Sequence, residues 1–270
     1  MYTFHKDKKK YFYWQYEIAR DWIIPFIEEV APVSSEAKVL EIGCAQAGVL
    51  SAFSERGLSC VGIEFNHNSI KLANEYLAEE IATGQVSIVD SDIYDIEPSA
   101  DNDYKFDLIL LKDVIEHIFD QEKFLGHLKK FLKPGGRVFF GFPPWQMPFG
   151  GHQQICKSKF LRKLPYFHLF PAPMYRAILK LGKEIPNRLE ELMEIKETGL
   201  SIERFNGMLK RQGYKTDLKH SFLTNPIYSK KFGLKTRKQL GLISAVPVLR
   251  NFLTTAVYYL VSLEDYEKEM

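Results

Sequence analysis

Short apolar runs alternate with amphipathic segments through the middle of the chain. The apolar runs predict buried strands at residues 37–42, 59–64, 85–90, 106–111 and 136–142. The segments between them have helical periodicity and predict helices at residues 47–56, 67–82 and 120–132. Strands that alternate with helices in this way predict an α/β fold with a parallel, doubly wound sheet and right-handed crossovers.

The two ends of the chain have different patterns. Residues 1–35 predict a helical layer that Pro25 kinks or divides, with a basic cluster from Lys6 to Lys10 at its start. Residues 201–213 predict a helix with Ser201 as its N-cap and Gly213 at its end. Further strands are expected at about 214–222 and 255–263.

Residues 144–200 separate the alternating region from the C-terminal part. Residues 143–153 are rich in proline, glycine and aromatic side chains, and they follow a strand whose end should lie at the ligand edge of the sheet. Residues 157–183 contain lysine, arginine and interleaved aromatic residues but no acidic residue, and residues 184–197 are acidic and helical. We therefore expect four parts: an N-terminal helical layer or lid (1–35), a core (36–143), an insertion that caps a substrate (144–200) and the C-terminal part of the core fold (201–270).

Composition narrows the class of protein. The chain has 270 residues, of which 46% are hydrophobic and 26% charged, with a formal net charge of +2. This balance predicts a soluble globular protein without strong general affinity for nucleic acid. Three cysteines without C-x-x-C spacing argue against a disulfide framework or a zinc site and suit the reducing cytoplasm. No signal peptide is expected, and Pro247 and Arg250 interrupt the longest apolar stretch, so we expect no transmembrane helix.

A glycine turn at residues 43–48 is the first candidate for ligand binding. Residues 38–50 predict a buried strand, a tight turn and the N-terminus of a helix, which together form a common binding device for nucleotides. Gly43, Ala45 and Gly48 fit a loose G-x-G/A-x-x-G pattern, which is also compatible with a dinucleotide site.

Three acidic residues favour a ligand without phosphate. Glu41, Glu64 and Asp92 each lie at or just beyond the end of a predicted strand, so a parallel sheet would gather them at one edge. Glu41 would repel a pyrophosphate. An ammonium group, a ribose diol and an exocyclic amine would all suit carboxylates, and S-adenosylmethionine carries these three groups.

Two further motifs complete a resemblance to a known family. Residues 106–117 form an acidic and hydrophobic strand followed by Glu116-His117, and Pro134-Gly135-Gly136 predicts a tight turn between a helix and the fifth strand. With these motifs in order, residues 36–143 resemble the class I S-adenosylmethionine-dependent methyltransferases. The resemblance implies a seven-stranded, mostly parallel sheet in the order 3-2-1-4-5-7-6, with the last strand antiparallel and helices on both faces. Family members often have glycine where this chain has Ala45 and Ala47, and alanine does not easily adopt a positive φ.

The resemblance also implies roles for individual residues. Glu41 would reach the methionine ammonium, Glu64 the ribose hydroxyls and Asp92 the adenine amine, with Asp90 as an alternative for the last role. Phe65 and Ile93 would line the adenine, Gln46 would face the methionine carboxylate, and Lys112 and Asp113 would lie beneath the methionine. The cofactor-binding candidates are Glu41, Gly43, Cys44, Gln46, Gly48, Glu64, Phe65, Asp92, Ile93, Lys112 and Asp113.

Two histidines are candidates for a general base. His117 follows the fourth strand and is either structural or catalytic, and His152 lies in the Gly-Gly-His-Gln loop. His168 lies among aromatic residues and suits packing or substrate lining. No metal site is predicted, because adjacent Glu116 and His117 have poor geometry for two ligands of one ion.

The sequence thus predicts a cytoplasmic enzyme that moves a methyl group from S-adenosylmethionine to an oxygen or nitrogen atom, leaving S-adenosylhomocysteine. The layout resembles the ubiquinone-biosynthesis O-methyltransferases and related enzymes, which implies a small acceptor, lipophilic or anionic. Nucleic acid is disfavoured as a partner, residues 157–183 could touch a membrane, and the protein could be a monomer or homodimer. The alternatives are an RNA or protein methyltransferase, a noncatalytic S-adenosylmethionine-binding protein and an NAD-dependent dehydrogenase.

Overall fold

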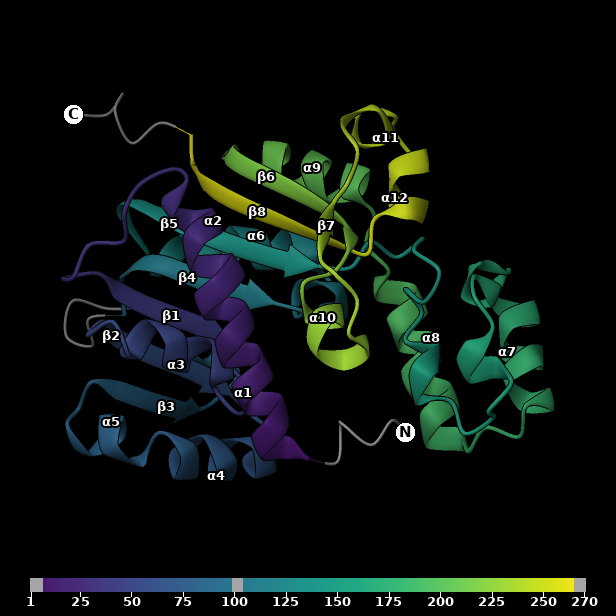
Figure 1. Cartoon of the computed structure of the whole chain (residues 1–270), viewed down its shortest axis with the longest axis horizontal. Coiled ribbons are helices and arrows are strands. Elements are labelled where there is room, and N and C mark those ends of the chain that lie inside the picture. Colours follow the sequence, from purple (N-terminus) through teal and green to yellow (C-terminus); the bar gives the residue numbers. More distant parts are fainter. Residues whose placement is uncertain (1–6, 99–103, 265–270) are drawn as a thin grey trace.

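An eight-stranded sheet runs through the computed structural model, which describes residues 7–98 and 104–264 (Figure 1). Its strand order is β3-β2-β1-β4-β5-β8-β6-β7. β1 to β5 pair in parallel, whereas β8 runs antiparallel to both β5 and β6. The strands are β1 (Lys38–Ile42), β2 (Ser59–Glu64), β3 (Val86–Asp90), β4 (Phe106–Lys112), β5 (Leu132–Phe142), β6 (Tyr214–Thr224), β7 (Arg237–Lys238) and β8 (Ala256–Leu263).

The seven expected strands and their order are confirmed, and β7 is an addition. β7 has two exposed residues and pairs with the outer side of β6. A pair of exposed basic residues has no apolar alternation, so no sequence pattern indicated this edge strand.

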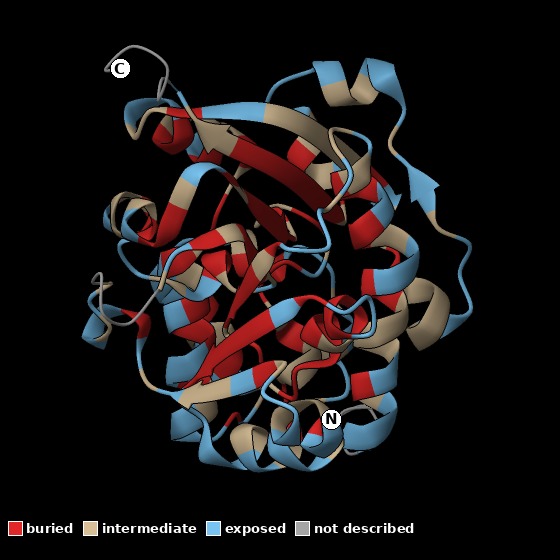
Figure 2. Ribbon diagram, turned by 90° about the vertical axis from the view of Figure 1, so that its left-hand side faces the viewer, coloured by how far each residue is buried: buried red, intermediate tan, exposed pale blue. Residues whose placement is uncertain are grey.

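Alternate residues of the central strands face opposite layers of the core. On β4, Leu108 and Leu110 belong to one buried cluster, whereas Ile109 and Leu111 belong to the other. The first cluster lies beneath α1 (Lys8–Ile18) and α3 (Gly48–Ser54), and the second beneath α6 (Gln121–Leu128) and α9 (Ile202–Arg211). Figure 2 shows the resulting pattern, with buried strands between helices that expose their outer faces. Because the strands are buried on both faces, they appear in the sequence as continuous apolar runs.

The helices before the C-terminal part are shorter or more divided than expected. The predicted helix 67–82 is broken at Leu77 into α4 (His67–Tyr76) and α5 (Ala78–Ala82). At the N-terminus, a π-helical segment (Ala19–Ile23) separates α1 from α2 (Ile24–Glu28). Pro25 lies just after this segment and has no backbone N–H, and a π-helical turn is one way to absorb such an interruption. Of the basic cluster, Lys6 lies outside the described residues.

The expected turn at Pro134-Gly135-Gly136 is part of a strand. β5 begins at Leu132, and its register against β4 shifts between the pairs at Phe106 and Leu108. Gly135 has a φ of 75° inside this irregularity. The three residues therefore form a bulge within β5 instead of a turn before it.

Residues 144–200 form a helical insertion that includes α7 (Ala172–Leu181) and α8 (Pro186–Thr198). In Figure 1 they lie beyond the ends toward which β4 and β5 point. The insertion has its own apolar cluster, which contains Cys156, Leu161, Phe167, Tyr175, Leu179, Leu189, Leu192 and Met193. The Glu184 carboxylate accepts hydrogen bonds from the backbone N–H groups of Lys157 and Ser158, which ties the two ends of the basic stretch together.

The C-terminal part contributes more than the expected helix and strands. α9 begins after Ser201, whose hydroxyl accepts a hydrogen bond from the Arg204 N–H, so the predicted N-cap is confirmed. Between β6 and β8 the chain forms α10 (Ile227–Phe232), α11 (Gly241–Ala245) and α12 (Leu249–Leu253). Within the described residues, no helix is both long and apolar enough to cross a membrane.

Gly48 allows α1 to pack against α3. A Cβ atom at this position would overlap the Phe12 carbonyl oxygen and lie 2.9 Å from the Gln15 Cβ. We expect Gly48→Ala to lower the free energy of unfolding by about 1–3 kcal/mol, because backbone on α1 must move. Urea denaturation measures this loss. The control is Gly241→Ala, where nothing lies within 4 Å and the change should be within about 0.5 kcal/mol. Equal effects would contradict the close packing of α1 on α3.

Candidate active site

The glycine turn after β1 lies against the end of β4. Gly43 has a φ of 67°, and its N–H donates to the Ile63 carbonyl over 2.8 Å. A Cβ atom on Gly43 would lie 2.9 Å from Val114 Cγ2. Glycine is therefore required both by the backbone conformation and by the close approach of Val114.

Two alanines in the same turn are strained. Ala45 has a φ of 48° and Ala47 a φ of 61°, so both adopt the left-handed conformation that alanine was expected to avoid. Such a conformation costs a residue with a Cβ roughly 1–2 kcal/mol. Ala47 is also the N-cap of α3, where its carbonyl accepts from the Ser51 N–H. The turn holds a strained shape, which is common at ligand sites.

Glu41 lies buried behind this turn. Its Oε2 accepts a hydrogen bond of 3.1 Å from the Leu50 N–H in the first turn of α3. Burial raises the pKa of Glu41 to about 8, although the Leu50 N–H and the Lys112 charge act in the opposite direction. A carboxyl group with this pKa is mostly protonated at neutral pH until a cation approaches it.

Glu64 joins the ends of β1 and β2. Its Oε1 accepts 2.9 Å hydrogen bonds from the N–H groups of Phe65 and Asn66, and its Oε2 accepts one of 2.9 Å from Ala45. A carboxylate offers about four acceptor positions, so capacity remains for a ligand. Phe65 follows with 70% of its surface exposed, so an apolar ring is accessible beside the carboxylate.

Asp92, the third acidic residue, is more exposed than Glu41 and Glu64. Asp92 is exposed, and its Oδ1 accepts from the Tyr94 N–H at the start of a short 3-10 turn. Asp90 pairs with His67 at 2.9 Å. Ile93 is buried in the sheet cluster, so little of its side chain is accessible to a ligand.

The remaining turn residues differ in their surroundings. Gln46 is buried, and its Nε2 donates a hydrogen bond of 3.3 Å to Ser69 Oγ. Cys44 is buried against Gly62, where an added Cβ would lie 2.8 Å from its Sγ. Gly48 faces α1, as described above. The structure thus places the Cys44 side chain and the Gly48 Cα in packing contacts.

Lys112 and Asp113 form an ion pair of 2.5 Å where β4 ends. The Lys112 side chain is only 4% exposed, and Asp113 has a φ of 58°, which aspartate tolerates better than most residues. Burial opposes both charges, but their mutual attraction outweighs it, so the pKa of Asp113 is lowered and that of Lys112 raised. Asp113 is therefore a fixed negative charge at the end of the strand.

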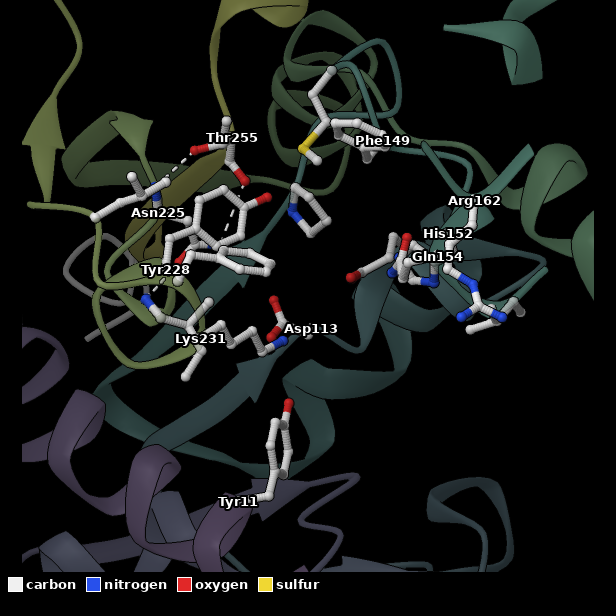
Figure 3. A pocket seen from close by; sticks show the side chains of 17 residues that line it. Tyr11, Asp113, Phe149, His152, Gln154, Arg162, Asn225, Tyr228, Lys231 and Thr255 are labelled. Carbon is white, nitrogen blue, oxygen red and sulfur yellow. Dashed lines mark hydrogen bonds between the residues drawn. The ribbon is translucent and has the colours of Figure 1, made fainter. Parts of the chain in front are cut away.

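A cavity of about 470 Å³ opens above Asp113 (Figure 3). Parts of the chain that are distant in sequence line it: α1, the end of β4, the insertion, α10 and the residue before β8. In Figure 3, Asp113 lies between Tyr11 and Tyr228, and His152, Gln154 and Arg162 lie on the right-hand side. Its lining comprises Tyr11, Asp113, Glu116, Pro143, Met147, Phe149, His152, Gln154, Ile155, Arg162, Asn225, Ile227, Tyr228, Lys231, Phe232, Leu234 and Thr255. The volume suits a small molecule.

α10 forms a wall of the cavity that no sequence pattern indicated. Lys231 lies 5.4 Å from the centre of the Tyr11 ring, which brings α10 and α1 together over the cavity. Burial lowers the pKa of Lys231 to about 8, and Lys112 adds to this effect whereas Asp113 opposes it. Two consecutive lysines at 230–231 resemble a solvated surface in the sequence, so no pattern indicated that one of them enters a cavity.

The two candidate bases lie together. The ring centres of His117 and His152 are 4.9 Å apart. Burial lowers the pKa of both, that of His152 to about 3, where the neighbouring His117 contributes as well. His168 packs inside the insertion instead, with its Nε2 2.8 Å from the Trp145 carbonyl oxygen.

Glu116 joins this histidine pair. One ligand atom from each of Glu116, His117 and His152 lies within 4.8 Å of the other two. No metal site was expected, because the cysteines lack ligand spacing and Glu116-His117, the one adjacent pair of an acid and a histidine in the sequence, has poor geometry for two ligands. His152, carried by a distant loop, changes that geometry.

Comparisons with known proteins agree with this arrangement. A family model described as a methyltransferase domain matches residues 13–164. The ubiquinone biosynthesis O-methyltransferase of Idiomarina loihiensis is 31% identical over 116 residues, 43% of this chain and 46% of that protein. Phosphoethanolamine N-methyltransferase 2 of Caenorhabditis elegans is 35% identical over 102 residues, 37% of this chain and 22% of that protein. The chain therefore spans less than half the length of these two curated relatives.

A solved structure shares the fold across most of the chain. Phosphoethanolamine N-methyltransferase 2 of Haemonchus contortus, in complex with phosphomonomethylethanolamine and S-adenosylhomocysteine, aligns with a TM-score of 0.55. The alignment covers 93% of this chain and 57% of that one, at 14% sequence identity. The Rossmann-like methyltransferase fold is thus common to both.

The raised pKa of Glu41 predicts a pH-dependent stability. Its pKa rises from the usual 4.5 to about 8 on folding, so the stabilisation it gives is complete below about pH 4.5 and is lost as the pH rises through 8. Glu41→Gln keeps an acceptor for Leu50 but cannot ionise. We expect urea denaturation to give equal stabilities at about pH 5, and a variant more stable by about 2–4 kcal/mol at about pH 8.5. Parallel pH profiles would contradict the pKa shift.

Proposed function

The chain belongs to the methyltransferase domain family, and from this premise we propose that it moves a methyl group from S-adenosylmethionine to a small molecule. The acceptor atom is an oxygen or a nitrogen, and S-adenosylhomocysteine is the product. The observation that carries this proposal is the cavity lined by Asp113, because Asp113 directly precedes Val114, against which Gly43 of the glycine turn packs. A cofactor on the turn would direct its methyl group toward that cavity.

The carboxylates around the turn suit this cofactor. We propose that Glu41 compensates the methionine ammonium, directly or through water, and that Glu64 accepts hydrogen bonds from the ribose diol. Phe65 would line the adenine, and Ile93 would contribute only the small part of its side chain that is exposed. Asp92 would accept from the adenine amine, while Gly43, Gln46, Lys112 and Asp113 would surround the methionine. Cys44 and Gly48 would act by shaping the turn. Glu41 and Glu64 accept hydrogen bonds from backbone N–H groups, and two carboxyl groups beside the turn disfavour the pyrophosphate of NAD.

The reaction needs alignment more than activation. The sulfonium is already a good leaving group, so the acceptor atom attacks the methyl carbon while the carbon–sulfur bond breaks and its electron pair stays on sulfur. The protein holds the two reactants in line and excludes water. Where the acceptor must lose a proton, His117 is the better base, because the very low pKa of His152 makes it a weak one.

The cavity favours a small acceptor with apolar surface and one polar end. Met147, Phe149, Ile227 and Phe232 offer apolar contacts, and Lys231 offers a cation. The names of the two curated relatives indicate O- and N-methyltransferases, so both kinds of acceptor atom stay in the proposal. A cavity walled by the insertion and α10 suits RNA or a protein chain less well, and those acceptors remain the alternatives.

We propose that residues 1–35 act as a lid, residues 36–143 as the cofactor-binding core, residues 144–200 as the substrate cap and residues 201–270 as the rest of the core. Residues 157–183 expose Phe160 and Leu181, which supports contact with a lipophilic acceptor or a membrane surface. We further propose a cytoplasmic monomer or homodimer.

Cofactor binding is tested by calorimetry with S-adenosylmethionine, S-adenosylhomocysteine and NAD. We expect the two adenosyl compounds to bind and NAD not to bind, and Glu64→Gln to weaken binding at least about tenfold by removing a charged acceptor. Glu75→Gln is the control, because Glu75 is an exposed carboxylate on α4. Binding of NAD alone would favour a dehydrogenase. Adenosyl binding without methyl transfer to any acceptor tested would favour a noncatalytic protein.

The binding of the polar end of the acceptor is tested by substituting Lys231. We expect Lys231→Met to raise KM about tenfold for an anionic acceptor found by screening phenols, carboxylic acids and amines, with a smaller effect on kcat. In the wild type, KM should also rise as the pH passes about 8, where Lys231 loses its charge, and the variant should lack this rise. Lys235→Met is the control, because Lys235 is exposed. An unchanged KM in Lys231→Met would exclude Lys231 from acceptor binding.

A further inference from the structure

A carboxyl group without a partner lies in the wall of the cavity. Glu116 is only 6% exposed, and neither of its carboxyl oxygens has a hydrogen-bond partner among residues 7–98 and 104–264. It belongs to the lining of the cavity. A buried carboxyl group is costly unless something compensates it, and proteins rarely leave one unpaired.

Two imidazoles lie next to this carboxyl group. Glu116 and His117 are carried by one short 3-10 turn (Ile115–His117) directly after β4, and His152 comes from the loop at the start of the insertion. His152 has a φ of 52°, a conformation that costs a non-glycine residue energy. The fold thus holds a strained residue where its ring meets His117 and Glu116.

These side chains form a recognised set of metal ligands. Two imidazole nitrogens and one carboxylate oxygen suit zinc and neighbouring divalent transition metals, and leave further coordination positions free. In a tetrahedral zinc site the ligand atoms are about 3.4 Å apart, because each lies about 2.1 Å from the ion. The three ligand atoms are within 4.8 Å of one another, so side-chain rotations that move them closer by roughly an ångström would complete the set.

We propose that Glu116, His117 and His152 bind one zinc-class divalent cation in the wall of the acceptor cavity. The site contains no cysteine, so the cysteine spacing gave no indication of it. Its ligands come from two segments that meet only in the folded chain. Glu116 and His152 line the cavity, so the free coordination positions face the space in which the acceptor would lie.

The role of this ion rests on the proposed methyl transfer. A bound cation lowers the pKa of a coordinated hydroxyl group, which then loses its proton to water at neutral pH. The resulting oxygen anion attacks the methyl carbon, the carbon–sulfur bond breaks, and its electron pair remains on the sulfur of S-adenosylhomocysteine. The ion would thereby select acceptors with a hydroxyl group over amines, and it would remove the need for a histidine base.

The test is calorimetry with ZnCl₂ on the full chain after dialysis against a chelator, with MgCl₂ as the comparison. We expect one zinc ion to bind per chain and magnesium to bind much more weakly. Glu116→Gln, His117→Asn and His152→Asn should each weaken zinc binding at least about tenfold, since even residues that merely orient a ligand cost that much. His67→Gln is the matched control, because His67 and Asp90 form an exposed pair that could bind zinc adventitiously.

Each sample is also titrated with S-adenosylhomocysteine. Binding of this compound shows, independently of zinc binding, that the variant is folded and that its cofactor site is intact. Cobalt loading gives a second readout, because the visible absorption of the bound ion should be present in His67→Gln and absent in His117→Asn. The proposal is overturned if the wild type binds no zinc, if magnesium binds equally well, or if none of the three substitutions weakens binding. Zinc binding without adenosyl binding would leave the metal site standing and refute the proposed function, and the reverse result would refute the metal site alone.

Discussion

The close approach of the glycine turn to the end of β4 is the constraint on which the site depends. There is no room for a Cβ atom between Gly43 and Val114, and Gly43 also has the left-handed backbone conformation that glycine adopts readily. Ala45 and Ala47 continue the turn with positive φ, at a cost that the surrounding contacts must offset. Glu64 contributes by accepting from the Ala45 N–H, and Glu41 by accepting from Leu50 in α3. The same two carboxylates are our candidates for holding the cofactor, so ligand binding and loop structure are coupled.

Once the turn is fixed, the other elements close a cavity around Asp113. Gly48 leaves room for α1 to pack against α3, and α1 carries Tyr11 to one side of the cavity. The segment between β6 and β8 folds back as α10 and supplies Lys231, and the insertion supplies His152. Figure 3 shows these contributions meeting at Asp113, although they come from the whole length of the chain. Burial in this cavity lowers the pKa of Lys231 to about 8, so the protonation of its side chain changes near neutral pH.

The sequence predicted the sheet well because burial on both faces leaves a strong signal. Val39 and Leu40 enter opposite clusters, so the strand must be apolar at every position. The carboxylates at the strand ends could be predicted for a related reason, since parallel strands end at one edge. Features that depend on tertiary contact left no such signal. The left-handed alanines, the bulge at Gly135, the entry of Lys231 into a cavity and the meeting of His152 with Glu116 all depend on how distant segments pack.

A crystal structure with bound S-adenosylhomocysteine would test the central claim most directly, because the claim concerns where the cofactor lies. Our account predicts both ribose hydroxyls within hydrogen-bond distance of Glu64, the methionine end beside Gly43 and Asp113, and the sulfur facing the cavity that Lys231 and Glu116 line. A ligand bound elsewhere, or bound with its ribose away from Glu64, would contradict the assignment of the glycine turn as the cofactor site.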